Sequence, residues 1–144
     1  PSHANFIVPG KRPLSSMSPI MVENRHTGAL ELIVGSSGGS RIITANILTT
    51  YAYLSHHGQV SMDDVIARPR WHDQLLPPVT VFEYPGAQTP GFDNATVRAL
   101  TAKGHQAAYT APGLSNTQAI QHMHAGLWHA ASERRQYEAR GAAI

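Results

Sequence analysis

The sequence contains no cysteine among its 144 residues. A chain without cysteine forms neither a disulfide framework nor a thiolate metal site. Charged residues are also scarce and make up 14% of the chain, whereas about 25% is typical of a soluble domain. The chain is long enough for one core of ordinary size, but a surface this poor in charge predicts that another polypeptide covers part of it.

The sequence also lacks a long apolar segment. No run approaches the roughly 20 residues that cross a bilayer, and the first residues have neither the basic start nor the apolar core of a signal peptide. Lysine and arginine number 11 against 9 acidic residues and form no stripe. We therefore expect no nucleic-acid partner.

Histidine is the one metal-binding side chain that is plentiful, with nine in the sequence. His122 and His124 would lie on one face of a strand, because side chains alternate along a strand. With no cysteine and no carboxylate at ligand spacing, we predict no native metal site.

The pattern of apolar runs, glycines and prolines predicts an α+β fold with helices layered on an antiparallel sheet. Two apolar runs around His26-Thr27-Gly28 predict a β-hairpin, and continuous runs of this kind are typical of strands covered on both faces. Ser61 and Asp93 are placed to cap helices. The expected strands are 20–25, 29–35, 79–84, 105–110, 117–124 and 127–132, and the expected helices are 40–57, 61–67 and 93–104.

The predicted helix 40–57 has apolar side chains around most of its circumference. A helix of this kind is buried rather than amphipathic. We expect it to pack on the sheet with one side and on other protein with the other, and to end at Gly58, a residue favoured just past a helix. If its second side were left bare, the helix would favour aggregation.

A pair of serines bracketed by prolines precedes the hairpin. Pro13 and Pro19 restrict the backbone between them, and Ser15 and Ser16 can both donate hydrogen bonds to one small anion such as a carboxylate. The same residues also fit a surface turn in which the hydroxyls satisfy local backbone groups. The residues alone leave both interpretations open.

A glycine pair, Gly38-Gly39, stands between the second strand and the long helix. Glycine lets backbone N–H groups approach a ligand, and the positive end of the helix adds to the attraction. Two such donors can hold the oxyanion of a tetrahedral intermediate in acyl transfer. A tight turn without a ligand is the alternative, and the missing lysine of a phosphate-binding loop argues against a nucleotide.

The order of these motifs resembles the small subunit of γ-glutamyltransferases, which are N-terminal-nucleophile amidases that mature by self-cleavage. The similarity runs from about Pro9 to about Arg135 and includes Ser-Ser-Met between prolines, a strand pair, Ser-Gly-Gly, a helix, and Pro-Arg-x-His-x-Gln at 69–74. It implies a layered αββα sandwich that another polypeptide completes. Residues 1–144 would then form a single partial domain.

The resemblance implies a role for each pair. Ser15 and Ser16 would bind the α-carboxylate of a γ-glutamyl group, and Gly38 and Gly39 would supply the oxyanion hole. A threonine whose free α-amine acts as its base would attack the γ-amide of glutathione or a similar donor. The glutamyl group would then pass to water or to an amino acid or peptide, without a metal or organic cofactor.

The resemblance also implies partners. In the family, the nucleophilic threonine and the residues that bind the donor's α-amine lie upstream of the segment that begins here at Pro1, and an arginine of the site lies on the large subunit. The expected partners are therefore the large subunit and the upstream small-subunit segment of the same precursor. The expected substrates are glutathione or another γ-glutamyl donor and an acceptor amino acid or dipeptide.

Two further segments have expected structural roles. Arg70, His72 and Gln74 are expected to form a polar brace after a helix. The segment that ends at Arg135 is similar to the family's closing segment, yet the charge pattern from Glu133 to Arg140 is typical of a solvated tail of mixed sign.

Two alternative functions remain open. One is a related acylase that acts on a β-lactam side chain or on polyglutamate, although the serine pair favours a donor with a free α-carboxylate. The other is a catalytically inactive light-chain-like binding module, which the missing threonine favours. The resemblance, with a glycosylation sequon at Asn94, implies an extracellular, cell-surface or periplasmic location.

Overall fold

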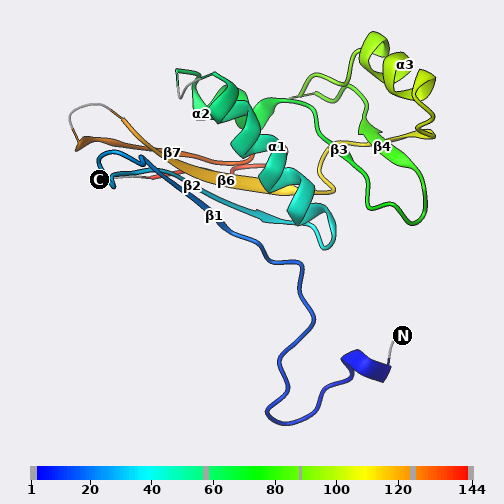
Figure 1. Ribbon diagram of the computed structural model, residues 1–144, viewed down its shortest axis with the longest axis horizontal. Helices are drawn as coiled ribbons and strands as arrows, with labels where there is room; N and C mark the ends of the chain where they lie inside the picture. Colours follow the sequence, from blue (N-terminus) through cyan, green and yellow to red (C-terminus); the bar gives the residue numbers. More distant parts are fainter. Residues whose placement is uncertain (1–2, 57–58, 88, 124–125, 143–144) are drawn as a thin grey trace.

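A computed structural model describes residues 3–56, 59–87, 89–123 and 126–142. Its strands form two sheets, and the helices that contact the larger sheet lie on one side of it (Figure 1). Residues 3–19, which include a short 3-10 helix at His3–Asn5, extend away from this body as an N-terminal arm. The expected α+β fold class is confirmed.

The larger sheet is antiparallel and has the order β1-β2-β6-β7. Its members are β1 (Ile20–Glu23), β2 (Leu30–Ser37), β6 (Asn116–His122) and β7 (Trp128–Ala131). The pairing of β2 with β6 joins residues that are far apart in sequence, such as Ser36 and Thr117. This central pair positions the end of β2, where the glycine pair follows.

One face of this sheet packs against α1 (Arg41–Ser55) and α2 (Met62–Ala67) (Figure 1). Alternation along β2 directs Leu32 and Val34 into this layer, and both are fully buried. The core that forms here consists of Leu32, Val34, Ala52, Tyr53, Met62, Val65, Ile66, Ala119 and Ala131.

The opposite face of the sheet carries apolar side chains, and no helix of the described residues covers them (Figure 1). The register aligns Met21 with Ile33 and Ile33 with Ile120, so the three form one row across β1, β2 and β6. Met21 is 68% exposed and Ile120 is 37% exposed. The chain therefore supplies one helix layer and one large sheet, which is part of the expected αββα sandwich.

A smaller sheet of order β3-β4-β5 is formed by β3 (Trp71–His72), β4 (Thr80–Glu83) and β5 (Ala107–Thr110). The expected antiparallel sheet is confirmed in the larger sheet, whereas β4 and β5 of the smaller sheet pair in parallel. The reason is α3 (Asn94–Ala102), which lies between them in the chain. A strand-helix-strand connection returns the chain in its original direction.

The surface of α1 that faces away from the sheet is apolar and exposed, which matches the expectation for its second side. Ile43, Ile47, Tyr51 and Leu54 form this outer α1 surface and are 46%, 55%, 70% and 48% exposed. The buried side holds small and polar residues instead, among them Ala45, Asn46, Thr49 and Ala52. Gly58, which was expected to end the helix, lies outside the described residues.

The two expected caps have different outcomes. Asp93 caps α3 as expected, since its Oδ1 accepts a hydrogen bond from the Thr96 N–H over 2.7 Å. The cap by the Ser61 hydroxyl was wrong, because this hydroxyl makes no cap hydrogen bond. The Ser61 backbone carbonyl instead accepts from Asp64 N and Val65 N, each over 3.0 Å.

In the part of the chain that the structure describes, no helix is long and apolar enough to cross a membrane.

Candidate active site

The β1–β2 hairpin places the serine pair and the glycine pair at the same end of the larger sheet. Ile20 is opposite Val34 in an antiparallel register. Ser16 stands four residues before Ile20, and Gly38 stands four residues after Val34. The pairing ends at this register, and the segment that carries the serine pair continues from there into the N-terminal arm (Figure 1).

The two serines differ in their surroundings. Ser15 is exposed, and its Oγ accepts a hydrogen bond from the Met17 N–H over 3.0 Å. This is the local turn that one interpretation of the sequence expected. The bond uses a lone pair of the hydroxyl and leaves its proton free to donate. Ser16 is half-buried, so the turn and the anion-binding role are compatible.

The glycine pair forms a turn that other residues fit poorly. Gly38 has φ of +128° and Gly39 has φ of +62°, and a Cβ on Gly38 would lie 2.5 Å from the carbonyl oxygen of Leu114. The Gly38 and Gly39 carbonyls accept from Arg41 N and Ile42 N, over 3.3 and 3.1 Å, at the start of α1. Within the described residues neither glycine N–H donates a hydrogen bond. Both donors are therefore available to a ligand.

A buried ion cluster underlies this end of the fold. Its members are Arg70, Glu83, Glu133 and Arg135, whose side chains are between 0% and 7% exposed. Arg70 Nη1 lies 2.7 Å from Glu133 Oε2. Arg135 binds both carboxylates, at 2.7 Å from Glu83 Oε2 and 2.9 Å from Glu133 Oε1. The cluster therefore joins the closing segment of the chain to β4 and to the residues after α2.

Backbone groups complete the cluster. Arg70 Nη1 donates to the Ser115 carbonyl over 2.8 Å, and Arg135 Nη2 donates to the Arg68 carbonyl over 2.7 Å. Glu133 Oε2 accepts from the Thr117 N–H of β6 over 2.9 Å. Buried charges are stable only when they are paired and hydrogen-bonded in this way.

The ionisation of the cluster follows from these contacts. Burial opposes the charged form of Glu133, but Arg70 and Arg135 outweigh it and lower the pKa of Glu133 below its ordinary value. Burial and the nearby Arg135 lower the pKa of Arg70 despite the Glu133 carboxylate. Burial also opposes the charged form of Arg135, but its hydrogen bonds to Glu83 and Glu133 outweigh burial and raise the pKa of Arg135 above its ordinary value. The directions of the Glu133 and Arg135 shifts both favour the charged form of the side chain.

The expected solvated tail from Glu133 to Arg140 was wrong for its first residues. Glu133 is fully buried, and the Arg135 side chain is 1% exposed. The charge pattern could not distinguish them from Arg134, which is exposed. The similarity of this segment to the family's closing segment was the sequence signal that pointed to an ordered role.

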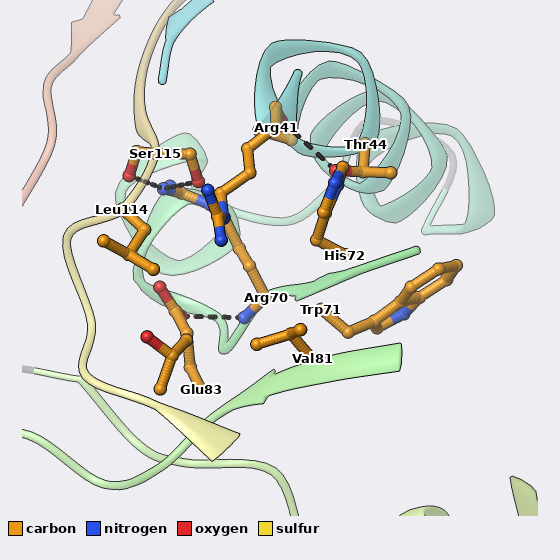
Figure 2. Close-up of a pocket in the computed structure, with 11 residues that line it drawn as sticks. Arg41, Thr44, Arg70, Trp71, His72, Val81, Glu83, Leu114 and Ser115 are labelled. Atoms are coloured by element: carbon orange, nitrogen blue, oxygen red, sulfur yellow. Dashed lines mark hydrogen bonds between the residues drawn. The ribbon is translucent and has the colours of Figure 1, made fainter. Parts of the chain in front are cut away.

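The polar brace expected at Arg70, His72 and Gln74 is confirmed. His72 Nδ1 lies 2.9 Å from Thr44 Oγ1 of α1, and His72 Nε2 lies 2.9 Å from Gln74 Oε1. Thr44, Arg70 and His72 line a small pocket between the start of α1 and the smaller sheet (Figure 2). Arg41 extends into this pocket from the first turn of α1 (Figure 2).

Among the described residues, no group of three or more histidine, aspartate or glutamate side chains could hold a metal ion. His124 lies outside the described residues, so the expected pairing with His122 is untested. His122 stacks near Trp128, with ring centroids 4.8 Å apart. Its packing is therefore that of a sheet residue.

The two-layer arrangement matches that of the N-terminal-nucleophile hydrolases, the class of protein to which its solved structural neighbours belong. A solved γ-glutamyltranspeptidase variant from Helicobacter pylori matches 94% of this chain and 69% of its own, with a TM-score of 0.76 and 30% identity. The family model for gamma-glutamyltranspeptidase matches residues 1–143. This chain belongs to the γ-glutamyltranspeptidase family.

Curated relatives agree with this assignment. The chain is 33% identical over 135 residues to a glutathione hydrolase proenzyme from Arthroderma benhamiae. This match covers 94% of this chain and 21% of the relative. It is 38% identical over 117 residues to the glutathione hydrolase proenzyme of Escherichia coli. This match covers 81% of this chain and 18% of the relative. The chain thus spans about a fifth of the length of these relatives.

Proposed function

We propose that this chain is part of a γ-glutamyltransferase that also acts as a glutathione hydrolase. The observation that carries the proposal is the hairpin register in a member of this family: it places the start of β1, which Ser15-Ser16 precede, and the end of β2, which Gly38-Gly39 follow, at one end of the sheet. The serine pair would bind the α-carboxylate of a γ-glutamyl donor. The free glycine N–H groups would face the donor's γ-carbonyl oxygen.

The chemistry needs a nucleophile from outside these residues. A threonine Oγ forms a bond to the γ-carbonyl carbon while the threonine α-amine takes the hydroxyl proton. The negative oxygen that results accepts hydrogen bonds from the Gly38 and Gly39 N–H groups. Collapse breaks the C–N bond, and the leaving amine takes the proton. Water or an acceptor amine then attacks the acyl-threonine and releases the glutamyl group by the reverse steps.

A substitution at Gly38 tests the oxyanion role. We expect Gly38→Ala to lower kcat by about 100-fold or more, the range seen when one oxyanion donor is lost. The reason is that the new Cβ would stand 2.5 Å from the Leu114 carbonyl oxygen and 2.9 Å from Ser115 Cα, so the turn must shift. Steady-state kinetics of the full-length protein measure the effect.

The matched control for this substitution is Gly28→Ala. Gly28 has a positive φ of +69° as well, but nothing lies within 4 Å of its added Cβ. It therefore also places a side chain at a positive φ, in a hairpin turn away from the candidate site. An equal loss of kcat in both variants would contradict a role for the Gly38 N–H in catalysis.

We also propose that the partners are the large subunit and the upstream small-subunit segment of one precursor. Two relatives are named as proenzymes, and the outer α1 surface leaves four large apolar side chains exposed. A contiguous apolar surface of this kind is typical of an interaction site. The large subunit is the proposed occupant of the outer α1 surface.

Substitution of Tyr51 tests this interface. We expect Tyr51→Lys to weaken subunit association more than tenfold, since it removes a tyrosine anchor and buries a charge at a cost of roughly 2 kcal/mol or more. Ala99→Lys is the control, because it adds the same charge at an exposed position of α3. Dissociation of the purified subunits in urea measures the difference. Equal dissociation of the two variants would exclude the outer α1 surface as the interface.

We propose an extracellular, cell-surface or periplasmic location for the protein. Asn94 of the sequon is exposed at the first residue of α3, which is compatible with a glycan there. A mass shift on removal of N-linked glycans from the native protein would support an extracellular route. The absence of that shift would leave the periplasm as the proposed location.

One experiment tests the proposed function directly. The denatured masses and N-terminal residues of the polypeptides in the purified full-length protein are measured together with turnover of γ-glutamyl-p-nitroanilide. We expect a companion polypeptide that begins with threonine, and turnover that free glutamate inhibits. Turnover that glutamate does not affect would favour the related acylase, and no turnover would favour the inactive binding module.

A further inference from the structure

A buried asparagine of α1 links the N-terminal arm to the larger sheet. Asn46 is 1% exposed. Its Nδ2 donates a hydrogen bond to the Ser18 carbonyl over 2.6 Å, and its Oδ1 accepts one from the Ser36 hydroxyl over 2.6 Å. One side chain therefore connects the arm that carries Ser15 and Ser16 to β2, which leads into the glycine pair.

The partners of Asn46 fix the direction of each hydrogen bond. The Ser18 carbonyl only accepts, so it must face the amide nitrogen, and Oδ1 must face Ser36. Because the Ser36 hydroxyl gives its proton to Asn46, it accepts from Thr117 Oγ1, 2.9 Å away. The Thr117 N–H donates to Glu133. A continuous line of hydrogen bonds thus runs from the buried ion cluster to the arm.

The contact at Ser18 lies close to the serine pair. Ser18 is two residues after Ser16 and directly precedes Pro19, whose ring restricts the backbone of its neighbour. Among the described residues, no other hydrogen bond joins residues 10–18 to α1, α2, α3 or either sheet. This amide therefore supplies the hydrogen bond that fixes the segment of the serine pair to the helix layer.

We propose that Asn46 is a positioning residue for donor binding, an inference that rests on the proposed function. Asn46 acts through the Ser18 backbone and sets the separation between the carboxylate-binding serines and the glycine N–H groups. With the Asn46 amide in place, the serine pair holds the donor's α-carboxylate at a fixed distance from the glycine N–H groups, which hold the γ-carbonyl. Without the amide, the arm moves the serine pair away and this distance is no longer fixed.

The test uses Asn46→Asp in the full-length protein. Aspartate keeps an oxygen facing Ser36 but replaces the Nδ2 donor with an acceptor that faces the Ser18 carbonyl. We expect KM for γ-glutamyl-p-nitroanilide to rise about tenfold, the effect of one lost hydrogen bond, while kcat stays within about twofold. Asn46→Leu, which removes both bonds at similar volume, should raise KM at least as much.

Thr50→Val is the matched control. Thr50 lies one turn after Asn46 in α1, and its buried Oγ1 has no hydrogen-bond partner among the described residues. Valine has the same shape, so the control changes a buried hydroxyl of the same helix without touching the arm. We expect its KM and kcat to equal those of the unmodified protein.

A second measurement follows the arm itself. Amide hydrogen exchange of residues 10–19 should be faster in Asn46→Asp than in Thr50→Val. Unchanged KM and exchange overturn the proposal. A loss of kcat equal to the rise in KM, together with a lower melting temperature, also overturns it, because that result indicates a general structural role. If the unmodified protein turns over no γ-glutamyl donor, the proposed function itself fails, whereas normal turnover with a normal KM in Asn46→Asp rejects only the Asn46 assignment.

Discussion

Replacement of Glu133 by alanine is expected to destabilise the protein by roughly 3–5 kcal/mol, the usual effect of removing one partner from a buried ion pair. The reason is that Arg70 and Arg135 both lose a carboxylate while their side chains remain 7% and 1% exposed. The Thr117 N–H of β6 also loses its acceptor. Urea denaturation of the full-length protein measures the loss.

Glu138→Ala is the control for this experiment. Glu138 is an exposed glutamate of the same closing segment, and an exposed substitution of this kind usually changes stability by less than about 0.5 kcal/mol. If both variants unfold at the same urea concentration, the ion cluster contributes nothing measurable to stability.

The same carboxylate predicts how stability depends on pH. Because the folded protein lowers the pKa of Glu133 below its ordinary value of 4.5, its stabilising contribution is complete above that value and is lost as the pH falls through the lower folded pKa. We therefore expect the melting temperatures of the unmodified protein and of Glu133→Gln to differ most at neutral pH and to converge in acid. A constant difference between pH 7 and pH 3 would contradict the lowered pKa.

Replacement of both serines, Ser15→Ala with Ser16→Ala, is expected to lower kcat/KM for a γ-glutamyl donor by about 150-fold or more. Each hydroxyl donates to a charged carboxylate, and two such bonds together contribute roughly 3 kcal/mol or more. Most of the loss should appear as a higher KM, since the carboxylate is bound equally before and during the reaction. Steady-state kinetics with γ-glutamyl-p-nitroanilide measure it.

Two comparisons make this result specific to the carboxylate. Ser61→Ala removes an exposed hydroxyl that makes no cap hydrogen bond, and we expect it to leave the kinetics unchanged. A donor that lacks the α-carboxylate, 4-aminobutanoyl-p-nitroanilide, should react equally slowly with the double variant and with the unmodified protein. If the double variant binds the γ-glutamyl donor normally, the serine pair does not bind the carboxylate.

The sequence predicted the elements that carry the candidate site because local signals specify them. The proline-bracketed serines, the apolar hairpin and the glycines before a long apolar run each depend on neighbouring residues only. The hairpin register then follows from the short turn that joins the two apolar runs. The roles of Ser15, Ser16, Gly38 and Gly39 stay predictions, since a structure without a donor does not test them.

The errors in the sequence-based predictions share a different cause. Glu133 and Arg135 are buried because they form ion pairs with Arg70 and Glu83, which lie far away in sequence. No local sequence pattern predicts ion pairs between such distant residues. The parallel pairing of β4 with β5 was missed for the same reason. Asn46 was missed because a single polar residue in an apolar helix gives no sign of its partners, Ser18 and Ser36.

The pairing of β2 with β6 has a consequence for the order of folding. The partners Ser36 and Thr117 belong to strands separated by both helices of the core layer, α3 and the whole smaller sheet. Closing so long a loop has an entropic cost that local contacts cannot offset early, so folding should be slow. During synthesis, the β1–β2 hairpin emerges first and has an unpaired strand edge until β6 is made. The last quarter of the chain therefore decides when the sheet closes and how long that edge can pair with another molecule.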